Sequence, residues 1–596
     1  MSRPHGIVAA LATAENVHQR GFTFVGAKGP SEDLFLSYHQ LRAEAMKRAK
    51  FLLGLGLQRG DRLAMVVPDG QDFIPTFLAA LWAGIVPVPL YPPITLGKLD
   101  AFMDGLVSIL NVARPRILVT SERVGKVLWS AIGRIGSIEK VVLTGELAVA
   151  PAAELPPIEP AEDETAFLQF TSGSTATPKG VIVTHGSLAA NAKAILVDGL
   201  DARRDRDVAV SWLPLYHDMG LIGFVLTPIL DTISVVFIPT LSFIKNSTLW
   251  LETISKHKGT MSFAPNFAYA LVTKRARKEQ IARWDLSRMR VFGCGAEPIN
   301  PTVMRKFLET FAPAGLKPEV LLPAYGMAEA TLAMAFHGPL LPFKTERVDA
   351  KSYHGEQKAV RVDNGGEAVE AVSCGKTFPG HALSIQDAKG NTLPDRAIGE
   401  ICFRGPSVAN GYWESPEATR AAGMDVKGGW MRTGDLGYMV EGEVYVSGRL
   451  KDILIVNGRN YDPQRIEWLV DEIPGVRRGS AVVFTRPGTA SEEVVVVAES
   501  RDAEPAKLVE TIKARISEEV QLSVADVALV PAGSLPKTSS GKLQRRKTRE
   551  QYLGGRLGRD AGRFGGRLLV ARHLAWSMLG RARHEARSLL KRFGVQ

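Results

Sequence analysis

The residues best suited to chemistry lie at positions 170–180, which read Phe-Thr-Ser-Gly-Ser-Thr-Ala-Thr-Pro-Lys-Gly. A short apolar run leads into a loop of hydroxylated residues and glycines that closes on Lys179. Such a loop can direct backbone N–H groups, hydroxyls and one ammonium toward a polyphosphate. It is not a Walker A loop, because Pro178 and Gly180 stand where that motif needs glycine and Ser or Thr. An ordinary surface loop is the alternative, since these residue types favour turns.

Six further segments combine glycines with residues that can bind or polarise a substrate. Tyr325 offers a ring on which a base can stack, and Glu329 offers a hard oxygen for Mg²⁺. The carboxylate of Asp435 can accept hydrogen bonds from two hydroxyls. Lys542 follows a Ser-Ser-Gly loop, from which its ammonium can swing into a site. The segments are Ser-Trp-Leu-Pro-Leu-Tyr-His-Asp-Met-Gly-Leu-Ile-Gly at 211–223, Val-Phe-Gly-Cys-Gly-Ala-Glu-Pro-Ile at 291–299, Ala-Tyr-Gly-Met-Ala-Glu-Ala-Thr at 324–331, Met-Arg-Thr-Gly-Asp-Leu-Gly at 431–437, Ser-Gly-Arg-Leu-Lys-Asp at 447–452 and Leu-Pro-Lys-Thr-Ser-Ser-Gly-Lys-Leu-Gln-Arg at 535–545.

These segments, in this order and over roughly residues 25–552, resemble the adenylate-forming superfamily. That superfamily includes acyl-CoA synthetases, luciferases, adenylation domains of peptide synthetases and fatty acyl-AMP ligases. The chain departs from the pattern at Ala176, where the family usually has glycine and where a methyl group limits positive φ. It also has Ala328 where many relatives have a threonine on the α-phosphate. The α-phosphate then needs another donor, for which Thr171 and Lys542 are candidates. Alanine at 328 fits the fatty acyl-AMP ligase branch.

The resemblance implies a role for each matching residue. Lys542 would be the catalytic lysine that bridges the attacking carboxylate and the α-phosphate, and His217 would border the carboxylate site. Asp435 and Arg449 would hold the ribose, Glu329 would bind Mg²⁺, and Lys451 would be the hinge. The other expected nucleotide contacts are Thr171, Ser172, Gly173, Ser174, Thr175, Lys179, Gly295, Ala296, Glu297, Tyr325, Gly326 and Met327. Without the resemblance, His217 would be a packed residue, Asp435 a turn residue and Lys451 a surface lysine.

The elements that position these residues follow an α/β pattern. From about residue 40 to 320, apolar β-branched runs such as 62–68 alternate with stretches of 3.6-residue periodicity such as 38–55. This alternation predicts sheets covered by helices. From about 375 the strands shorten and turns become frequent, which indicates a smaller β-rich subdomain. A third unit, which starts near 451, combines strand-like runs with one helix and predicts a small α+β domain.

The resulting division has three parts. Residues 1–449 form a large N-terminal AMP-binding domain, which contains the sheets, the helices and the β-rich subdomain. Residues 450–552 form a small mobile C-terminal lid, with the hinge near Lys451, and 553–596 form a basic amphipathic tail. The polar, irregular stretch 340–372 resembles the insertion of fatty acyl-AMP ligases.

The function that the resemblance implies has two steps. A fatty acid reacts with ATP and Mg²⁺ to give an acyl-adenylate and pyrophosphate, and the acyl group then passes to the phosphopantetheine thiol of a separate acyl carrier protein. In the ligase branch the insertion disfavours CoA. The apolar stretches 224–230 and 262–271 suit a tunnel for an alkyl chain, or they are core elements.

Three other functions compete with this one. A long-chain acyl-CoA synthetase would show CoA-dependent activity. A non-catalytic acyl or nucleotide sensor is disfavoured because Lys542, Asp435 and Glu329 are all present. A membrane-tethered scaffold that recruits carrier proteins would bind its partners without consuming ATP.

The charge of the 596-residue chain, +11, is unevenly distributed. Residues 553–596 contain ten Lys or Arg and two Asp or Glu, so the basic balance describes the tail and is no sign of nucleic-acid binding by the body. Apolar residues at three- and four-residue steps make 567–593 a candidate for peripheral contact with the inner membrane face or for docking on an acidic carrier protein. A solvated, partly disordered tail is the alternative. Three cysteines form no disulfide framework, so a cytoplasmic location is expected.

Overall fold

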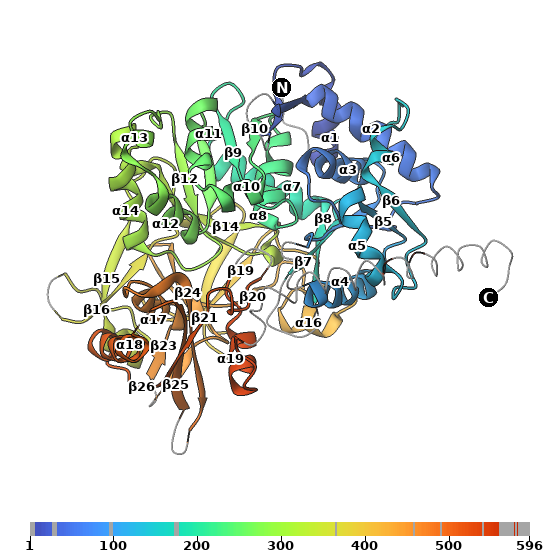
Figure 1. The fold of residues 1–596 in the computed structure, drawn as a ribbon. Helices are drawn as coiled ribbons and strands as arrows, with labels where there is room; N and C mark the ends of the chain where they lie inside the picture. The colour runs from blue at the N-terminus through green and yellow to red at the C-terminus, as the bar shows by residue number, and fades with distance from the viewer. Residues whose placement is uncertain are drawn as a thin grey trace.

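The computed structural model describes most of the chain, and Figure 1 shows its arrangement. It describes residues 6–26, 32–93, 99–171, 178–363, 366–456, 459–488, 492–502, 504–538 and 542–558, together with Ser577 and Arg581. A large body contains the N-terminal and central parts of the chain, and the C-terminal lobe lies against one side of it (Figure 1).

The body is built around a nine-stranded sheet. Its six central strands, from β13 to β1 in the order below, run parallel, whereas β2 at one end and β14 and β17 at the other end join through antiparallel pairing. The strand order is β17 (Lys376–Thr377), β14 (Ala333–Phe336), β13 (Leu321–Gly326), β12 (Val291–Cys294), β11 (Met261–Ala264), β9 (Val208–Ser211), β10 (Ser234–Phe237), β1 (Gly21–Phe24) and β2 (Leu34–Ser37). The central strands are buried on both faces, which is why they read as continuous apolar runs.

A second sheet of four parallel strands lies beside the first. Its order is β4 (Val86–Pro89), β3 (Arg62–Val66), β5 (Ile117–Thr120) and β6 (Lys140–Leu143). The hairpin of β7 (Thr165–Thr171) and β8 (Lys179–Thr184) runs next to β4. The expected sheets covered by helices are therefore confirmed.

The helices of the body connect these strands and cover the sheets. The helix at 38–54 begins at a capping box, in which Ser37 accepts from the Gln40 N–H and the Gln40 side chain accepts from the Ser37 N–H. The helices are α1 (Ile7–Ala12), α2 (Tyr38–Gly54), α3 (Gly70–Trp82), α4 (Leu99–Ala113), α5 (Glu122–Ile132), α6 (Thr144–Ala148), α7 (His185–Lys193), α8 (Asp218–Leu221), α9 (Thr227–Ile229), α10 (Thr240–Lys245), α11 (Leu249–His257), α12 (Asn266–Arg275), α13 (Lys278–Ile281) and α14 (Pro301–Phe311).

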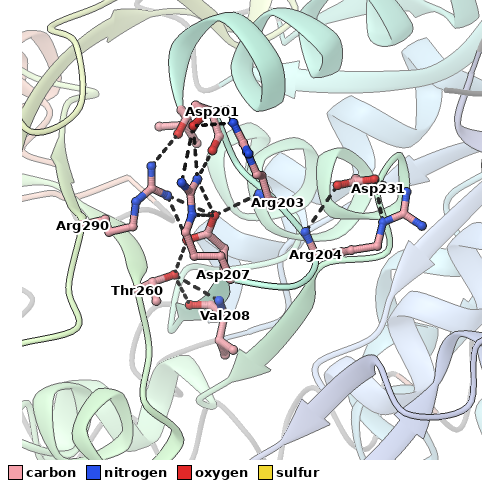
Figure 2. A network of polar contacts seen from close by, with 10 residues as sticks. Asp201, Arg203, Arg204, Asp207, Val208, Asp231, Thr260 and Arg290 are labelled. Carbon is pink, nitrogen blue, oxygen red and sulfur yellow. Dashed lines mark hydrogen bonds and ion pairs between the residues drawn. The ribbon is translucent and has the colours of Figure 1, made fainter. Parts of the chain in front are cut away.

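A polar network ties together the amino ends of three central strands (Figure 2). Asp207, which directly precedes β9, is fully buried and accepts hydrogen bonds from Arg290 Nη1 at 2.8 and 3.0 Å. Thr260, which precedes β11, donates to the same carboxylate at 2.9 Å. Arg290 lies just before β12, so three strands converge on one buried carboxylate. Arg204 pairs with Asp231 beside this network.

The β-rich subdomain expected after residue 375 is a four-stranded antiparallel sheet. Its strands are β18 (Ala382–Gln386), β19 (Gly399–Arg404), β20 (Met431–Val440) and β21 (Glu443–Arg449), with α16 (Pro416–Ala421) between the second and third. Residues 340–372, which were expected to be irregular, contain paired strands β15 (Thr345–Asp349) and β16 (Ala368–Val372) and helix α15 (Ala350–Gly355). The five-residue strands mix polar and apolar residues, and no long period marks them.

The C-terminal lobe has its own apolar core. A two-stranded sheet of β22 (Leu454–Val456) and β23 (Arg459–Tyr461) precedes a three-stranded sheet of β24 (Val476–Pro487), β25 (Glu492–Ser500) and β26 (Val524–Val530). The helices are α17 (Pro463–Asp471), α18 (Pro505–Val520) and α19 (Arg545–Leu553). The expected α+β character of this unit is confirmed. Among the described residues, no helix is long and apolar enough to span a membrane.

Candidate active site

The candidate site lies at the carboxyl ends of the central parallel strands, where open α/β sheets usually bind ligands. The chain leaves β9 toward His217, leaves β12 toward Ala296 and Glu297, and ends β13 at Tyr325 and Gly326. Gly295 follows β12 directly, and Met327 follows β13 in an extended conformation. The structure therefore brings three of the six expected motifs to one edge of the sheet.

The expected phosphate loop is flanked by paired strands. Thr171, the last residue of β7, is the register partner of Lys179, the first residue of β8. The loop residues between them that were expected to contact phosphate, Ser172, Gly173, Ser174 and Thr175, lie outside the described residues. The Lys179 ammonium lies 4.8 Å from the centre of the Tyr412 ring, a cation–π distance.

Tyr412 is a site residue that the sequence alone did not indicate. Its hydroxyl donates a 2.7 Å hydrogen bond to Oε1 of Glu329, so the phenol joins the loop lysine to the expected metal ligand. The segment around it pairs with β8 through Asn410 N–H to Ile182 O at 2.9 Å and Trp413 N–H to Gly180 O at 2.8 Å. This pairing joins positions more than 200 residues apart, and no motif spacing reveals it.

Glu329 sits in a strained segment. It lies in the short 3₁₀ turn Ala328–Ala330, which ends at Thr331 with φ 68° and ψ −58°. The Leu332 N–H donates to Ala330 O at 2.9 Å, so Thr331 is the centre of a γ-turn of the rare, strained kind. The Thr331 hydroxyl donates to Ser407 O at 2.7 Å and holds the turn in place. Strained backbone of this type concentrates at functional sites.

The pair expected to hold a ribose is present. Asp435 and Arg449 are register partners on β20 and β21, and Arg449 Nε lies 3.4 Å from Asp435 Oδ1. The Tyr325 hydroxyl donates to Asp435 Oδ2 at 2.9 Å. Burial raises the pKa of Asp435, and the nearby Arg449 cation and the Tyr325 hydrogen bond oppose that rise. The aspartate thus has two partners already, one on each oxygen.

Lys542 reaches from the C-terminal lobe into the body. Its ammonium donates a 2.6 Å hydrogen bond to the carbonyl of Ala296, which adopts a left-handed φ of 71°. Burial lowers the pKa of Lys542, whereas the carboxylates of Glu297 and Asp218 raise it. Burial also raises the pKa of Glu297. The lobe is therefore docked with its lysine inside the candidate site.

His217 and the hinge complete the expected set. His217 Nδ1 lies 2.5 Å from Oδ1 of Asp218, at the start of α8. Burial opposes ionisation of Asp218, but the interactions with His217 and Lys542 together lower its pKa. Lys451 is exposed in the turn that follows β21, at the passage from the body to the lobe.

Comparison with known proteins identifies the family. Residues 14–413 match the family model of AMP-binding enzymes, which is more than half of the chain. The chain belongs to the AMP-binding enzyme family. Residues 451–561 match a second model, described as the AMP domain of Disco-interacting protein 2-like proteins. The adenylate-forming family expected from the sequence is thereby confirmed.

Individual members of the AMP-binding enzyme family are similar over most of their length. A putative acyl-CoA synthetase of Caulobacter vibrioides is 38% identical over 531 residues, which cover 88% of this chain and 91% of that protein. The long-chain-fatty-acid–AMP ligase FadD26 of Mycobacterium marinum is 36% identical, with 87% and 91% covered. A structure from a study of fatty acyl-adenylate ligases of E. coli and L. pneumophila has a TM-score of 0.87 at 34% identity, with 93% and 99% covered. The expected resemblance to fatty acyl-AMP ligases is confirmed.

This AMP-binding enzyme has a narrow apolar cavity of about 50 Å³ next to the site. Met219, two residues after His217, lies in its wall with Phe224, Phe263 and Leu332. Two π-helical segments, Ala194–Gly199 and Ile222–Leu226, also contribute to the wall, and such segments often mark functional sites. Both apolar stretches that the sequence offered for an alkyl tunnel supply lining residues.

The 340–372 segment joins the body of the enzyme to the docked lobe. Arg465 of α17 donates to Glu370 O at 3.0 Å, and its guanidinium lies 5.4 Å from the Tyr353 ring centre. The His354 ring stacks on Tyr461 with 5.1 Å between centroids, and its Nδ1 lies 2.8 Å from Asn460 O. These contacts hold the lobe in the orientation that inserts Lys542.

Among the residues that the structure describes, no group of three or more His, Cys, Asp or Glu side chains could hold a metal ion by itself. The expected magnesium ligand, Glu329, is a single carboxylate with one oxygen bonded to Tyr412. Burial raises its pKa, and the Tyr412 hydrogen bond opposes that effect. One carboxylate fits a Mg²⁺ ion whose other ligands are phosphates and water, which is the usual arrangement with nucleotides.

Proposed function

We propose that this enzyme activates a fatty acid as its acyl-adenylate and then passes the acyl group to the phosphopantetheine thiol of an acyl carrier protein. The observation that carries the proposal is the contact between Lys542 and Ala296, beside His217 and an apolar cavity. A cation at this point can approach both an α-phosphate and a carboxylate whose alkyl chain enters the cavity. ATP is the substrate that supplies the adenylate.

In the first step a carboxylate oxygen attacks the α-phosphorus of ATP, and the bond to pyrophosphate breaks. Lys542 places a positive charge where negative charge gathers in the transition state. Burial lowers the pKa of this lysine, and the negative charge of a bound phosphate would favour its protonated form. Asp435 and Arg449 hold the ribose, and Lys179 faces the leaving phosphates. The chain's contribution is mainly orientation and charge stabilisation.

We propose that Glu329 holds Mg²⁺, with Tyr412 fixing the direction of its carboxylate. When bound, the metal neutralises charge on the phosphates. Glu329 is partly buried, and the Tyr412 hydroxyl bonds to Oε1, so we propose that the other carboxylate oxygen, Oε2, is the one that takes the ligand. The other expected nucleotide contacts, among them Gly295, Gly326 and Met327, line the same edge.

In the second step the carrier thiol attacks the acyl carbonyl, forms the thioester, and releases AMP and the thiol proton. The lobe must first withdraw Lys542 by rotation about the hinge at Lys451. Contacts such as the hydrogen bond from Arg465 to Glu370 O oppose large rotations of the lobe. This restriction favours a carrier protein, which docks from outside, over free CoA as the acceptor. The carrier is therefore the proposed partner, supplied as a separate protein.

A long-chain acyl-CoA synthetase is the second candidate function. The putative acyl-CoA synthetase of Caulobacter vibrioides, 38% identical to this chain, favours it. The two candidates share the adenylation step and differ in the thiol that receives the acyl group.

The deciding experiment supplies Mg·ATP and a C12 to C16 fatty acid, with CoA or a holo acyl carrier protein added separately. Mass spectrometry is expected to show acyl-AMP that persists with CoA and discharges onto the carrier. Rapid acyl-CoA formation would transfer the enzyme to the synthetase class. Lys542→Ala is expected to slow acyl-AMP formation roughly 10² to 10³-fold, whereas Lys547→Ala, an exposed lysine on α19, should leave it unchanged.

For location, we propose a cytoplasmic enzyme that touches the inner membrane face through residues 567–593. The support is their basic, amphipathic sequence, since nearly all of this tail lies outside the described residues. A chain truncated after Leu553 is expected to lose binding to anionic vesicles. Equal binding by both chains would refute the membrane contact.

A further inference from the structure

Three large apolar side chains are exposed together beside the candidate site. Leu241 and Ile244 of α10 are 52% and 48% exposed, and Phe267 of α12 is 37% exposed. The buried Trp212 connects them, because its ring stacks on Phe243 of α10 at 3.8 Å and meets Phe267 edge-on at 5.8 Å. We call Leu241, Ile244 and Phe267 the apolar strip. Exposed apolar clusters on enzymes usually mark binding surfaces.

The strip is close to the reacting groups. The backbone N–H groups of Asn266 and Phe267 face the carboxylate of Glu297. The residue before Glu297 is Ala296, whose carbonyl accepts the Lys542 ammonium. Phe267 lies on α12, the helix that follows β11. It is thus linked to the catalytic lysine through the neighbouring residues Glu297 and Ala296. A thiol that must reach the acyl carbonyl passes this region of the body.

Basic side chains border the strip at one end. Phe267, Leu271 and Arg275 lie on one face of α12 at four-residue spacing. Arg275 donates to the carbonyls of Ile244 and Lys245 at 3.1 and 3.3 Å, which joins the ends of α10 and α12. Exposed cations at this end are Lys245, Lys274, Arg275, Arg277 and Lys278, with Glu279 as the acidic residue in the same run.

We propose that the apolar strip and its basic border are the docking surface for the acyl carrier protein. This inference rests on the proposed function, which requires a carrier thiol at the site. The partner's chemistry is an acidic surface around an apolar centre, with the pantetheine arm projecting from it. Charge complementarity steers such a partner and fixes its register, and the apolar contact slows its release.

The test compares carrier transfer and carrier binding in full-length variants. The double change Leu241→Ser and Ile244→Ser is expected to raise the KM for holo acyl carrier protein about tenfold. Its titration with fluorescently labelled holo carrier should weaken to the same extent. Acyl-AMP formation without carrier should stay within twofold of the unmodified enzyme, because neither residue contacts the nucleotide site. Matched controls are Val149→Ser and Val426→Ser, at valines that are 83% and 63% exposed elsewhere.

Lys274→Glu tests the basic border separately. This change is expected to raise the KM for the carrier several-fold, because one attractive charge becomes repulsive. For the same reason, the KM for the carrier should rise less steeply with salt concentration than it does in the unmodified enzyme. Unchanged carrier binding in both variants would overturn the docking surface even with acyl-AMP formation intact. A loss of binding to anionic vesicles with carrier binding unaffected would also overturn it, and would make the strip a membrane contact. If the unmodified enzyme formed no acyl-AMP, the proposed function would be overturned instead. The titration with labelled carrier would still show whether the apolar strip binds the carrier.

Discussion

At the scale of single residues, Tyr412 links two functions of the site. Its hydroxyl orients Glu329 and its ring lies under the Lys179 ammonium. Glu329 needs such a partner, because a half-buried carboxylate without a fixed hydrogen bond would present its oxygens in several directions. The tyrosine therefore couples the proposed phosphate loop to the proposed metal ligand.

Tyr412→Phe keeps the ring and removes the hydrogen bond. Because hydrogen bonds to charged groups contribute about 1.5 to 3 kcal/mol, we expect acyl-AMP formation to slow roughly tenfold or more. Pyrophosphate exchange measured across Mg²⁺ concentrations should also show weaker apparent Mg²⁺ affinity.

Tyr412→Leu, which removes the ring as well, is expected to raise the KM for ATP further. If pyrophosphate exchange in Tyr412→Phe has the same rate and Mg²⁺ dependence as in the unmodified enzyme, Glu329 is oriented without the phenol.

Residue-level inference from sequence finds candidate residues where the motif is local, and their roles stay predictions. Lys542, Asp435 and Arg449 stand in compact motifs, and the structure brings them to one place. Tyr412 could not be found in this way, since its part in the site depends on pairing between 409–413 and β8. The stacking role expected for Tyr325 stays a prediction, and its hydroxyl has a second task on Asp435.

At the scale of elements, the polar network of Figure 2 fixes the amino ends of the central strands, opposite the site. The Asp207 side chain is completely buried, and it pairs with the mostly buried Arg290 and with the more exposed Arg206, whose Nη2 lies 3.1 Å from Asp207 Oδ2. Removing one partner of a buried ion pair typically costs about 3 to 5 kcal/mol, and Arg206 retains part of the compensation when Arg290 is lost.

Arg290→Leu is therefore expected to lower the unfolding temperature of the body by several degrees. The matched change Arg203→Leu affects an exposed pair with Asp201 and should leave it nearly unchanged. Differential scanning calorimetry of the two variants makes the comparison. Equal unfolding temperatures would show that solvent or other cations compensate Asp207.

Element prediction was best for strands buried on both faces, because their apolar runs leave few alternatives. It was wrong for 340–372, where β15 and β16 pair across nearly 20 intervening residues. Each strand is only five residues long, with one apolar residue in β15 and one polar residue in β16, so periodicity carries little information there. The Tyr438 hydroxyl donates a 2.7 Å hydrogen bond to Glu346 and so attaches the 340–372 segment to β20. No local sequence pattern predicts this contact.

At the scale of the whole molecule, the lobe is held by a few contacts from 345–372. Arg465→Ala removes the hydrogen bond to Glu370 O and the cation–π contact with Tyr353. We expect faster hydrogen exchange in 345–372 and measurable acyl-CoA formation, because the lobe turns more freely. Arg515→Ala, which affects an exposed pair within α18, is the control and should change neither measurement.

The same interface is expected to depend on pH through His354. Burial is the largest cause that lowers its pKa, to about 4, and Arg465 and Arg459 add to it. When the lobe is released, the pKa of the His354 ring returns to near 6.5. Protonation therefore favours release of the lobe between pH 6.5 and 4, and docking is strongest above that range. Between pH 7 and 5 we expect the docking equilibrium to weaken on the order of tenfold.

Hydrogen exchange in residues 345–372, measured at both pH values, reports this change. His354→Phe keeps a ring that can stack on Tyr461 but has no titrating nitrogen, so its exchange should vary less with pH. An identical pH response in this variant would assign the effect to another group.

The pairing of 409–413 with β8 has a consequence for biosynthesis. Strand β8, which pairs with β7 on one side, gains its second neighbour only when Trp413 has emerged from the ribosome, more than 200 residues later. Until then β8 has an open edge, and contacts between distant positions form slowly. A nascent chain that stalls before residue 409 would contain the complete sequence of the proposed phosphate loop. It would still lack the 409–413 segment that pairs with β8. Such intermediates should depend on chaperones until the later subdomain arrives.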